Sequence, residues 1–404
     1  MTYFIDITTL ATMIIMMGFL FSHQVRNSES WRATVTPLAS IIGSGFLIIA
    51  PLLWMFVGIW SPLVLVGTVT IAYFIGDAIR HNILMVEPLV EQGTAPPIIS
   101  KLSHASYFSL GLAYLISVAF YIRLLAAFVL KLMDIDESFY ADILSSSVLA
   151  FIGISGYIKG LDHLENLELA SVNSKIAIIV AFCVGIFIYD WKALNFTLQN
   201  SGNAIQWNFE TFQKLCGILL IVQGFETSRY LGSKYSPETR VKTMKRAQII
   251  SALIYFIFVS LSMFLMKEHH EVSETEIINI VKEVSVLFPI ILVFGAVFSQ
   301  FSSAVADTIG CGGLLSEATQ SRLTLHQSYA LVTTCAIILI WSANIFQIIT
   351  LASRAFALYY MLQAVEALVI SRHSKSKNTA QQVIFACISI LMLLVLIFAK
   401  SAEG

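Results

Sequence analysis

The chain has 404 residues, of which 57% are hydrophobic and 12% are charged, and its formal net charge is −1. A soluble domain carries about twice that share of charged residues, so the composition excludes an ordinary soluble protein and indicates an integral protein of the lipid bilayer. The near-zero net charge gives no reason to expect a nucleic-acid partner.

Apolar runs of span length predict twelve transmembrane helices, because a helix needs about 20 apolar residues to cross a bilayer. In chain order the predicted spans are Tyr3–Ser22, Thr34–Val57, Ser61–Ile79, Tyr107–Lys131, Ala141–Ile158, Leu169–Tyr189, Thr211–Gly232, Lys245–Met266, Leu287–Gly310, Gln327–Ala343, Phe346–Ser371 and Gln381–Lys400. We name the first an accessory helix, the next ten core helices 1 to 10, and the last a trailing helix. The predicted fold class is therefore an all-α integral membrane protein.

Core helices 1 and 6 are interrupted by small and polar residues. Gly43-Ser44-Gly45 interrupts the first, and Gln223-Gly224-Phe225-Glu226 interrupts the second, half a sequence later. Non-helical backbone at membrane depth survives only where it is buried in protein or lines a cavity. Paired breaks in two halves of a chain therefore indicate the binding site of a secondary transporter. Close helix packing through small residues is the alternative for the first break.

The core helices pair at a steady offset of roughly 180 residues, core helix 1 with 6 and so on to 5 with 10. Because each half has an odd number of spans, the halves face opposite ways, and the pattern predicts an inverted repeat. The predicted domains are an accessory part at 1–33, a first repeat at 34–189, a second repeat at 190–371 and a trailing part at 372–404.

Lysine and arginine gather in the loops of one side, and acidic residues gather in the loops of the other. The basic loops are 23–33, 80–106, 159–168, 233–244, 311–326 and 372–380. The positive-inside rule makes these loops cytoplasmic, so we expect both termini outside and place the protein in a bacterial inner membrane.

Several ionisable side chains lie within the spans, where they are costly and usually functional. We expect gating or ion-coupling roles for Glu226, Arg229, Lys175, Asp307, Arg123 and Arg354. Glu226 and Arg229 are also spaced to neutralise each other, and the arginines can instead snorkel or pair with acidic loops. Glu366 lies near a cytoplasmic span end, where a solvated charge is expected.

Core helix 8 carries the most polar stretch within any strongly apolar span, Phe298–Asp307. The adjacent hydroxyls of Ser302 and Ser303 suit a hard cation such as sodium, which prefers oxygen ligands. The alternative is that these serines bond back to carbonyls of their own helix.

Short motifs in this order resemble two known transporter families. Ile42-Gly43-Ser44-Gly45-Phe46, Gly224-Phe225-Glu226 with Tyr235–Arg240, and Leu169–Asn173 resemble core helices 1, 6 and 5 of the amino acid–polyamine–organocation (APC) transporters. The accessory helix, Gly93-Thr94 and Ser299–Asp307 are similar to the sodium/solute symporters. Both families have the LeuT-type fold of five plus five inverted helices, so the resemblance implies that fold.

The resemblance also implies a set of binding residues. Substrate would contact Ile42, Gly43, Ser44, Gly45, Gln223, Gly224 and Phe225, with pocket side chains such as Tyr121 and Gln300. Sodium would be held by Ala39, Ile42, Ser302 and Ser303. Proton-coupled permeases of the APC type place a lysine of helix 5 at that cation position. Here Lys175 falls earlier in the helix and Val180 is closer, which favours sodium.

We therefore expect a secondary active transporter of a small organic solute, most simply an amino acid or related amine, working by alternating access with sodium coupling. The alternatives are a proton-coupled or exchange-type amino acid permease, a sodium symporter for another solute, and a transport-inactive membrane sensor. No enzymatic activity is expected, and no cofactor other than the sodium ion. The sequence does not predict the oligomeric state.

Overall fold

The structure is a computed structural model that describes residues 2–43, 45–193, 208–266, 274–319, 322–373 and 378–401. Every regular element in these ranges is a helix, and they contain no strand. The helices are α1 (Thr2–Leu20), α2 (His23–Arg26), α3 (Glu29–Gly43), α4 (Phe46–Val57), η1 (Gly58–Trp60), α5 (Ser61–Met85), α6 (Glu87–Glu91), α7 (Pro97–Leu132), α8 (Ser138–Lys159), α9 (Asp162–Ala193), α10 (Phe209–Gly217), η2 (Leu219–Val222), η3 (Phe225–Ser233), α11 (Pro237–Ser262), α12 (Glu276–Lys282), α13 (Leu287–Ala318), α14 (Leu325–Ser342), α15 (Ile345–His373) and α16 (Thr379–Phe398).

Ten helical stretches in the described part are long and apolar enough to cross a membrane, which confirms the all-α membrane fold. Twelve spans are predicted because core helices 1 and 6 are each counted whole. The structure divides core helix 1 into α3 and α4 and core helix 6 into α10, η2 and η3, so no unbroken helix represents either span. These two broken spans account for the difference between the twelve predicted spans and the ten observed ones.

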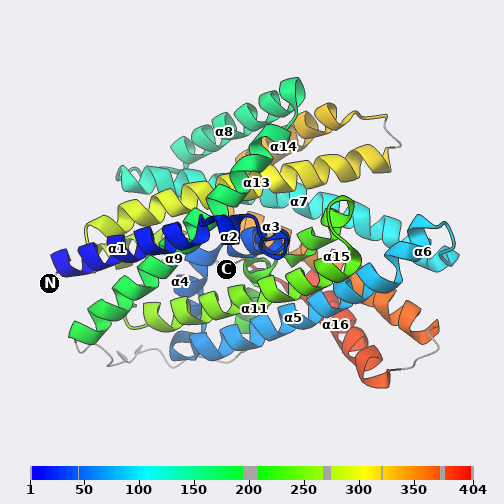
Figure 1. Ribbon diagram of the computed structural model, residues 1–404, viewed down its shortest axis with the longest axis horizontal. Helices are drawn as coiled ribbons and strands as arrows, with labels where there is room; N and C mark the ends of the chain where they lie inside the picture. Colours follow the sequence, from blue (N-terminus) through cyan, green and yellow to red (C-terminus); the bar gives the residue numbers. More distant parts are fainter. Residues whose placement is uncertain are drawn as a thin grey trace.

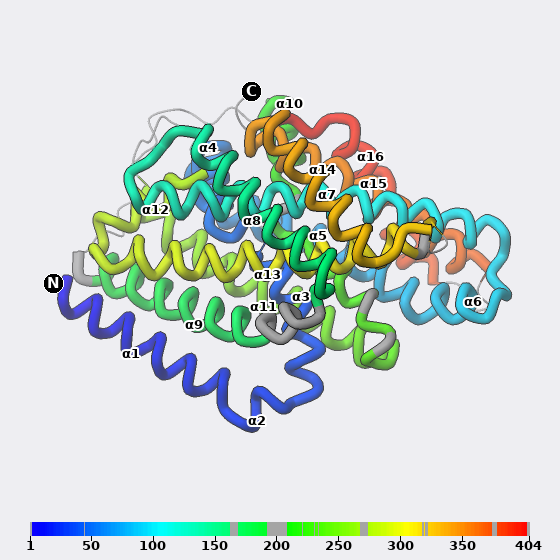
Figure 2. The backbone as a smooth tube through the Cα atoms, turned by 90° about the horizontal axis from the view of Figure 1, so that it is seen from above, coloured from blue at the N-terminus to red at the C-terminus, as the bar shows by residue number. Residues whose placement is uncertain are grey.

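The long helices run side by side along the longest dimension of the molecule (Figure 1). The accessory helix α1 lies along α9 at the edge of the bundle, while α6 and the neighbouring ends of α5 and α7 lie at the end of the molecule opposite the N-terminus (Figure 2). Asn173 fixes the turn from α1 toward core helix 1, because its side chain donates to the Leu20 carbonyl at 3.0 Å and accepts from the Trp31 indole at 3.2 Å.

Helix starts follow local capping chemistry. The side chain of Ser236 accepts from the Thr239 backbone N–H, and Pro237 occupies the first turn of α11, where its missing N–H costs nothing. Asn344 separates core helices 9 and 10 as predicted: its side chain accepts from the Gln347 N–H at 2.9 Å, and the Gln347 side chain accepts from the Asn344 N–H at 3.1 Å. This reciprocal pair satisfies the open N–H groups at the start of α15.

Candidate transport site

The break in core helix 1 lies between α3, which ends at Gly43, and α4, which begins at Phe46. Gly45 has a φ of 126°, a conformation that glycine adopts readily and other residues rarely do. Gly43 is tightly packed, because a Cβ at this position would lie 2.1 Å from Ser303 Oγ of α13. The predicted break is confirmed. Ser44, one of its predicted residues, lies outside the described residues.

The break in core helix 6 lies at Gln223 and Gly224, between η2 and η3. Gly224 has a φ of 117°, and a Cβ here would lie 2.5 Å from Ser40 Oγ and 2.6 Å from the Ser40 carbonyl carbon. The backbones of the two broken helices therefore touch at Gly224 and Ser40. Residues separated by half the sequence meet at one place, as expected for a shared binding site.

A tyrosine on α11 joins the two broken helices from a third side. The Tyr255 hydroxyl lies 2.8 Å from the Ile41 carbonyl oxygen of α3 and 2.7 Å from the Ile221 carbonyl oxygen of η2, and the residue is completely buried. Sequence reasoning missed this residue. An isolated tyrosine in an apolar helix carries no pattern that distinguishes it from core packing.

We expect Tyr255→Phe to lower the stability of the folded protein by about 1–3 kcal/mol, because it removes the buried hydroxyl that donates to one of the two carbonyl oxygens. The measurement is the thermal unfolding midpoint of the purified protein in detergent. Tyr140→Phe is the matched control, since Tyr140 is 48% exposed. Equal midpoints for the two variants would show that the hydroxyl does not hold the broken helices together.

Glu226 belongs to the break itself. One carboxylate oxygen accepts from the Gly224 N–H at 3.1 Å and from the Tyr360 hydroxyl of α15 at 2.6 Å. The neighbouring Phe225 ring is stacked on Tyr360 with a centroid separation of 5.5 Å. Because Gly224 has left the helical conformation, its N–H needs a partner, and the carboxylate supplies one. Glu226 thus has a structural role at the very position where a substrate would bind.

The expected neutralising pair of Glu226 and Arg229 is not formed. Arg229 Nε lies 3.1 Å from Glu87 Oε1, and Arg229 Nη1 lies 2.5 Å from Gln363 Oε1 and 4.0 Å from Glu366 Oε2. Glu226 turns back toward its own break, while the arginine reaches partners on α6 and α15. The spacing of the two residues along the chain therefore does not decide their pairing.

The partners of Arg229 form a buried polar network toward the predicted cytoplasmic side. Arg240 of α11 lies 2.7 Å from Glu87 Oε2 and donates to the Arg229 carbonyl at 2.8 Å. Glu366 is completely buried and accepts from Ser103 and from Asn82, so the expectation of a solvated charge is wrong. A cavity of about 400 Å³ lies beside this network, lined in part by Glu87, Arg229, Tyr107 and Arg240.

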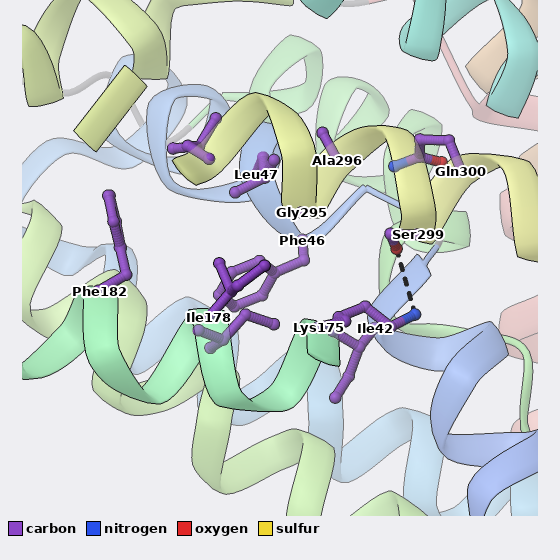
Figure 3. Close-up of a pocket in the computed structure, with 12 residues that line it drawn as sticks. Ile42, Phe46, Leu47, Lys175, Ile178, Phe182, Gly295, Ala296, Ser299 and Gln300 are labelled. Carbon is purple, nitrogen blue, oxygen red and sulfur yellow. Dashed lines mark hydrogen bonds between the residues drawn. The ribbon is translucent and has the colours of Figure 1, made fainter. Parts of the chain in front are cut away.

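Lys175 reaches the position predicted for the cation. Its Nζ donates to the Ala39 carbonyl at 2.9 Å and to Ser299 Oγ at 3.1 Å, with the side chain extending from α9 (Figure 3). Lys175 therefore reaches this position even though it lies earlier in its helix than expected, so the expectation that it falls short is wrong. The flexible four-carbon stem of lysine lets an amine lie well away from its own Cα.

Two of the predicted sodium ligands already have other partners in this arrangement. An ammonium group already bonds the Ala39 carbonyl, and Ser302 Oγ donates back to the Ser299 carbonyl of its own helix at 3.0 Å and lies 3.3 Å from Ser171 Oγ. Ser303 is packed against Gly43, and Ile42 lines a small cavity of about 30 Å³ beside Lys175. The alternative for Ser302, bonding within its helix, is the one observed.

Two further predicted residues, Arg123 and Arg354, have bonding partners outside the two breaks. Arg123 Nε is 2.8 Å from Asp142 Oδ1, so this arginine pairs with an acidic side chain, which belongs to helix α8 rather than to a loop. Arg354 donates to the Ala399 carbonyl just after α16. Both side chains therefore join helices to neighbouring segments.

Tyr121 and Asp307 do lie near the breaks. Tyr121 is buried, bonds the Ser40 side chain and interacts electrostatically with both Asp307 and Glu226. Asp307 accepts from Ser117 Oγ of α7. Tyr121, a predicted pocket residue, and Asp307, a predicted gating residue, thus lie in one buried polar cluster beside the breaks. Gln300, the other predicted pocket residue, is buried and lines the small cavity beside Lys175 and Ile42.

Two comparisons bear on what this arrangement does. Residues 23–399 match the model of a family described as an APC superfamily transporter. An uncharacterized protein of Aquifex aeolicus (strain VF5) is 41% identical over 403 residues, and the alignment covers 98% of each chain.

Proposed function

This chain belongs to a family of APC superfamily transporters, and from that premise we propose that it moves an amino acid or related amine across the membrane by alternating access. The proposed binding place is the contact of the two breaks. The observation that carries the proposal is the approach of Gly224 to Ser40, with φ values of 117° at Gly224 and 126° at Gly45. In transporters, unwound backbone of this kind at membrane depth typically forms the substrate-binding site.

We further propose that the proton, rather than sodium, is the coupling ion. The Lys175 amine supports this, because it bonds an α3 carbonyl and an α13 hydroxyl and so joins two helices that border the break. A protonated amine holds these contacts with charge-assisted hydrogen bonds. When the amine loses its proton, these hydrogen bonds weaken. Deprotonation of Lys175 therefore favours the movement of α3 away from α9 and α13.

The orientation and the membrane also belong to this proposal. Both termini lie outside, the protein resides in a bacterial inner membrane, and 34–189 and 190–371 are the two inverted repeats. The basic loops support the orientation. The network around Arg229 and Glu87 then lies at the cytoplasmic end and closes the inner path when its ion pairs are formed.

The test is uptake of labelled amino acids and amines into sealed proteoliposomes under imposed gradients. We expect saturable accumulation against a concentration gradient, driven by an inward proton gradient without sodium. Accumulation that needs a sodium gradient would support the sodium symporter instead. Binding of a solute without any flux would identify a transport-inactive sensor.

A further inference from the structure

The short segment that follows α16, residues 399–401, packs against α10, the first half of core helix 6. The Lys400 backbone N–H donates to the Gln213 carbonyl of α10 at 3.0 Å, and Arg354 of α15 donates to the carbonyl of Ala399, which is buried. α10 and α16 lie next to each other (Figure 2). The segment therefore joins core helices 6 and 10, and we call it the α10 strap.

Gly217, the last residue of α10, is the point where the α10 strap comes closest to the helix. A Cβ at Gly217 would lie 2.1 Å from the Lys400 carbonyl oxygen and 3.1 Å from the Lys400 carbonyl carbon, which are backbone atoms. The Gly217 carbonyl accepts from Ser353 Oγ of α15 at 2.8 Å. A residue without a side chain is needed here for the strap to fit, so α10, α15 and the strap meet at this glycine.

α10 depends on such contacts for its position because it is short. It has nine residues, and an isolated helix of fewer than about 12 residues is only marginally stable. At its start, the Phe209 ring meets the Phe398 ring of α16 edge-on, with a centroid separation of 5.2 Å. The Lys400 ammonium lies 3.8 Å from Oε1 of Glu210, whose side chain is 51% exposed, so this ion pair contributes little. The backbone hydrogen bond and the contact at Gly217 therefore carry most of the attachment to the strap.

We propose that the α10 strap holds the first half of core helix 6 against core helix 10, and that its release accompanies the opening of the solute site to the outside. This inference rests on the proposed function and on the proposed orientation, which places α10 at the outer end. η2 connects α10 to the break at Gln223 and Gly224, so a movement of α10 is transmitted to the place where solute binds. Gly217 and Lys400 are positioning residues, because they act through α10 and not on the solute.

The test is the rate at which a water-soluble maleimide labels the native Cys216 in the purified full-length protein in detergent, followed by peptide mass spectrometry. Cys216 belongs to α10 and is 6% exposed. Lys400→Pro removes the N–H that donates to Gln213, and Gly217→Ala places a methyl group against the Lys400 carbonyl. We expect each variant to label Cys216 at least fivefold faster than the wild-type protein does.

Lys400→Ala is the matched control, because it keeps the backbone N–H and removes only the ammonium group, and we expect it to label Cys216 at the wild-type rate. Cys311, which is completely buried on α13, is the internal control, and its labelling rate stays unchanged in every variant.

The inference is overturned if Lys400→Pro labels Cys216 no faster than Lys400→Ala does. An equal rise at Cys216 and Cys311 also overturns it, because that result indicates a general loosening of the fold. Gly217→Ala decides the matter if Lys400→Pro does not fold, and a wild-type labelling rate in this variant counts against the strap. Labelling needs no transported solute, so an absence of flux of any amino acid or amine refutes the proposed function and leaves the hold of the strap on α10 standing.

Discussion

We expect Lys175→Met to lower proton-driven accumulation of substrate in proteoliposomes at least tenfold relative to the wild-type protein. Methionine keeps an unbranched side chain of similar reach but removes the group that bonds the Ala39 carbonyl at 2.9 Å and Ser299 Oγ at 3.1 Å. Without the amine there is no group to carry a proton at this position, and the hydrogen bonds from α9 to α3 and α13 are lost. The measurement is initial uptake rate and final accumulation under an inward proton gradient.

Two comparisons make this result specific to the amine. Lys131→Met is the matched control, because Lys131 Nζ lies 2.8 Å from Oδ1 of the exposed loop residue Asp136. We expect this variant to accumulate substrate as the wild-type protein does. Substrate exchange without a gradient measures whether the variant still binds and moves solute. Full accumulation by Lys175→Met would exclude Lys175 as the proton carrier.

We expect Gly224→Ala to prevent the native contact between the two breaks and therefore to abolish transport. A Cβ at Gly224 would lie 2.6 Å from the Ser40 carbonyl carbon and 2.8 Å from the Ile41 nitrogen, and these are backbone atoms that cannot turn aside. The φ of 117° adds strain for any residue with a side chain, of about 1–3 kcal/mol. The measurements are the thermal unfolding midpoint and the uptake rate.

Gly67→Ala is the matched control for this substitution. Gly67 is an exposed position inside α5, in its second turn, and a Cβ there would meet no atom within 4 Å. Alanine in a helix interior is favoured over glycine by about 1 kcal/mol, so Gly67→Ala keeps or raises the unfolding midpoint. Wild-type uptake by Gly224→Ala would show that the two breaks need not touch.

The breaks could be predicted because they depend on local properties of the chain. Glycine weakens a helix wherever it stands, and polar residues inside an apolar run are visible without knowing their neighbours. Gly43, Gly45 and Gly224 therefore marked both breaks correctly. The same holds for Asn344, whose capping side chain bonds a residue three positions away.

The partners of the charged residues could not be predicted, because they come from distant helices. Lys175 bonds a carbonyl 136 residues away, and Arg229 bonds a side chain 134 residues away. A hydropathy pattern gives the length of a span but not its rotation or its neighbours. Glu366 illustrates the result: its position near a span end indicates solvent, yet α7 and α5 cover it completely.

The most direct test of proton coupling follows protons and solute together. Sodium-free proteoliposomes are loaded with a pH-sensitive dye, and the amino acid or amine that gives the highest accumulation is added outside. Proton coupling through Lys175 predicts that the lumen acidifies as the solute enters and that Lys175→Met shows no acidification. Solute entry without acidification, or entry only after sodium is added outside, would contradict it.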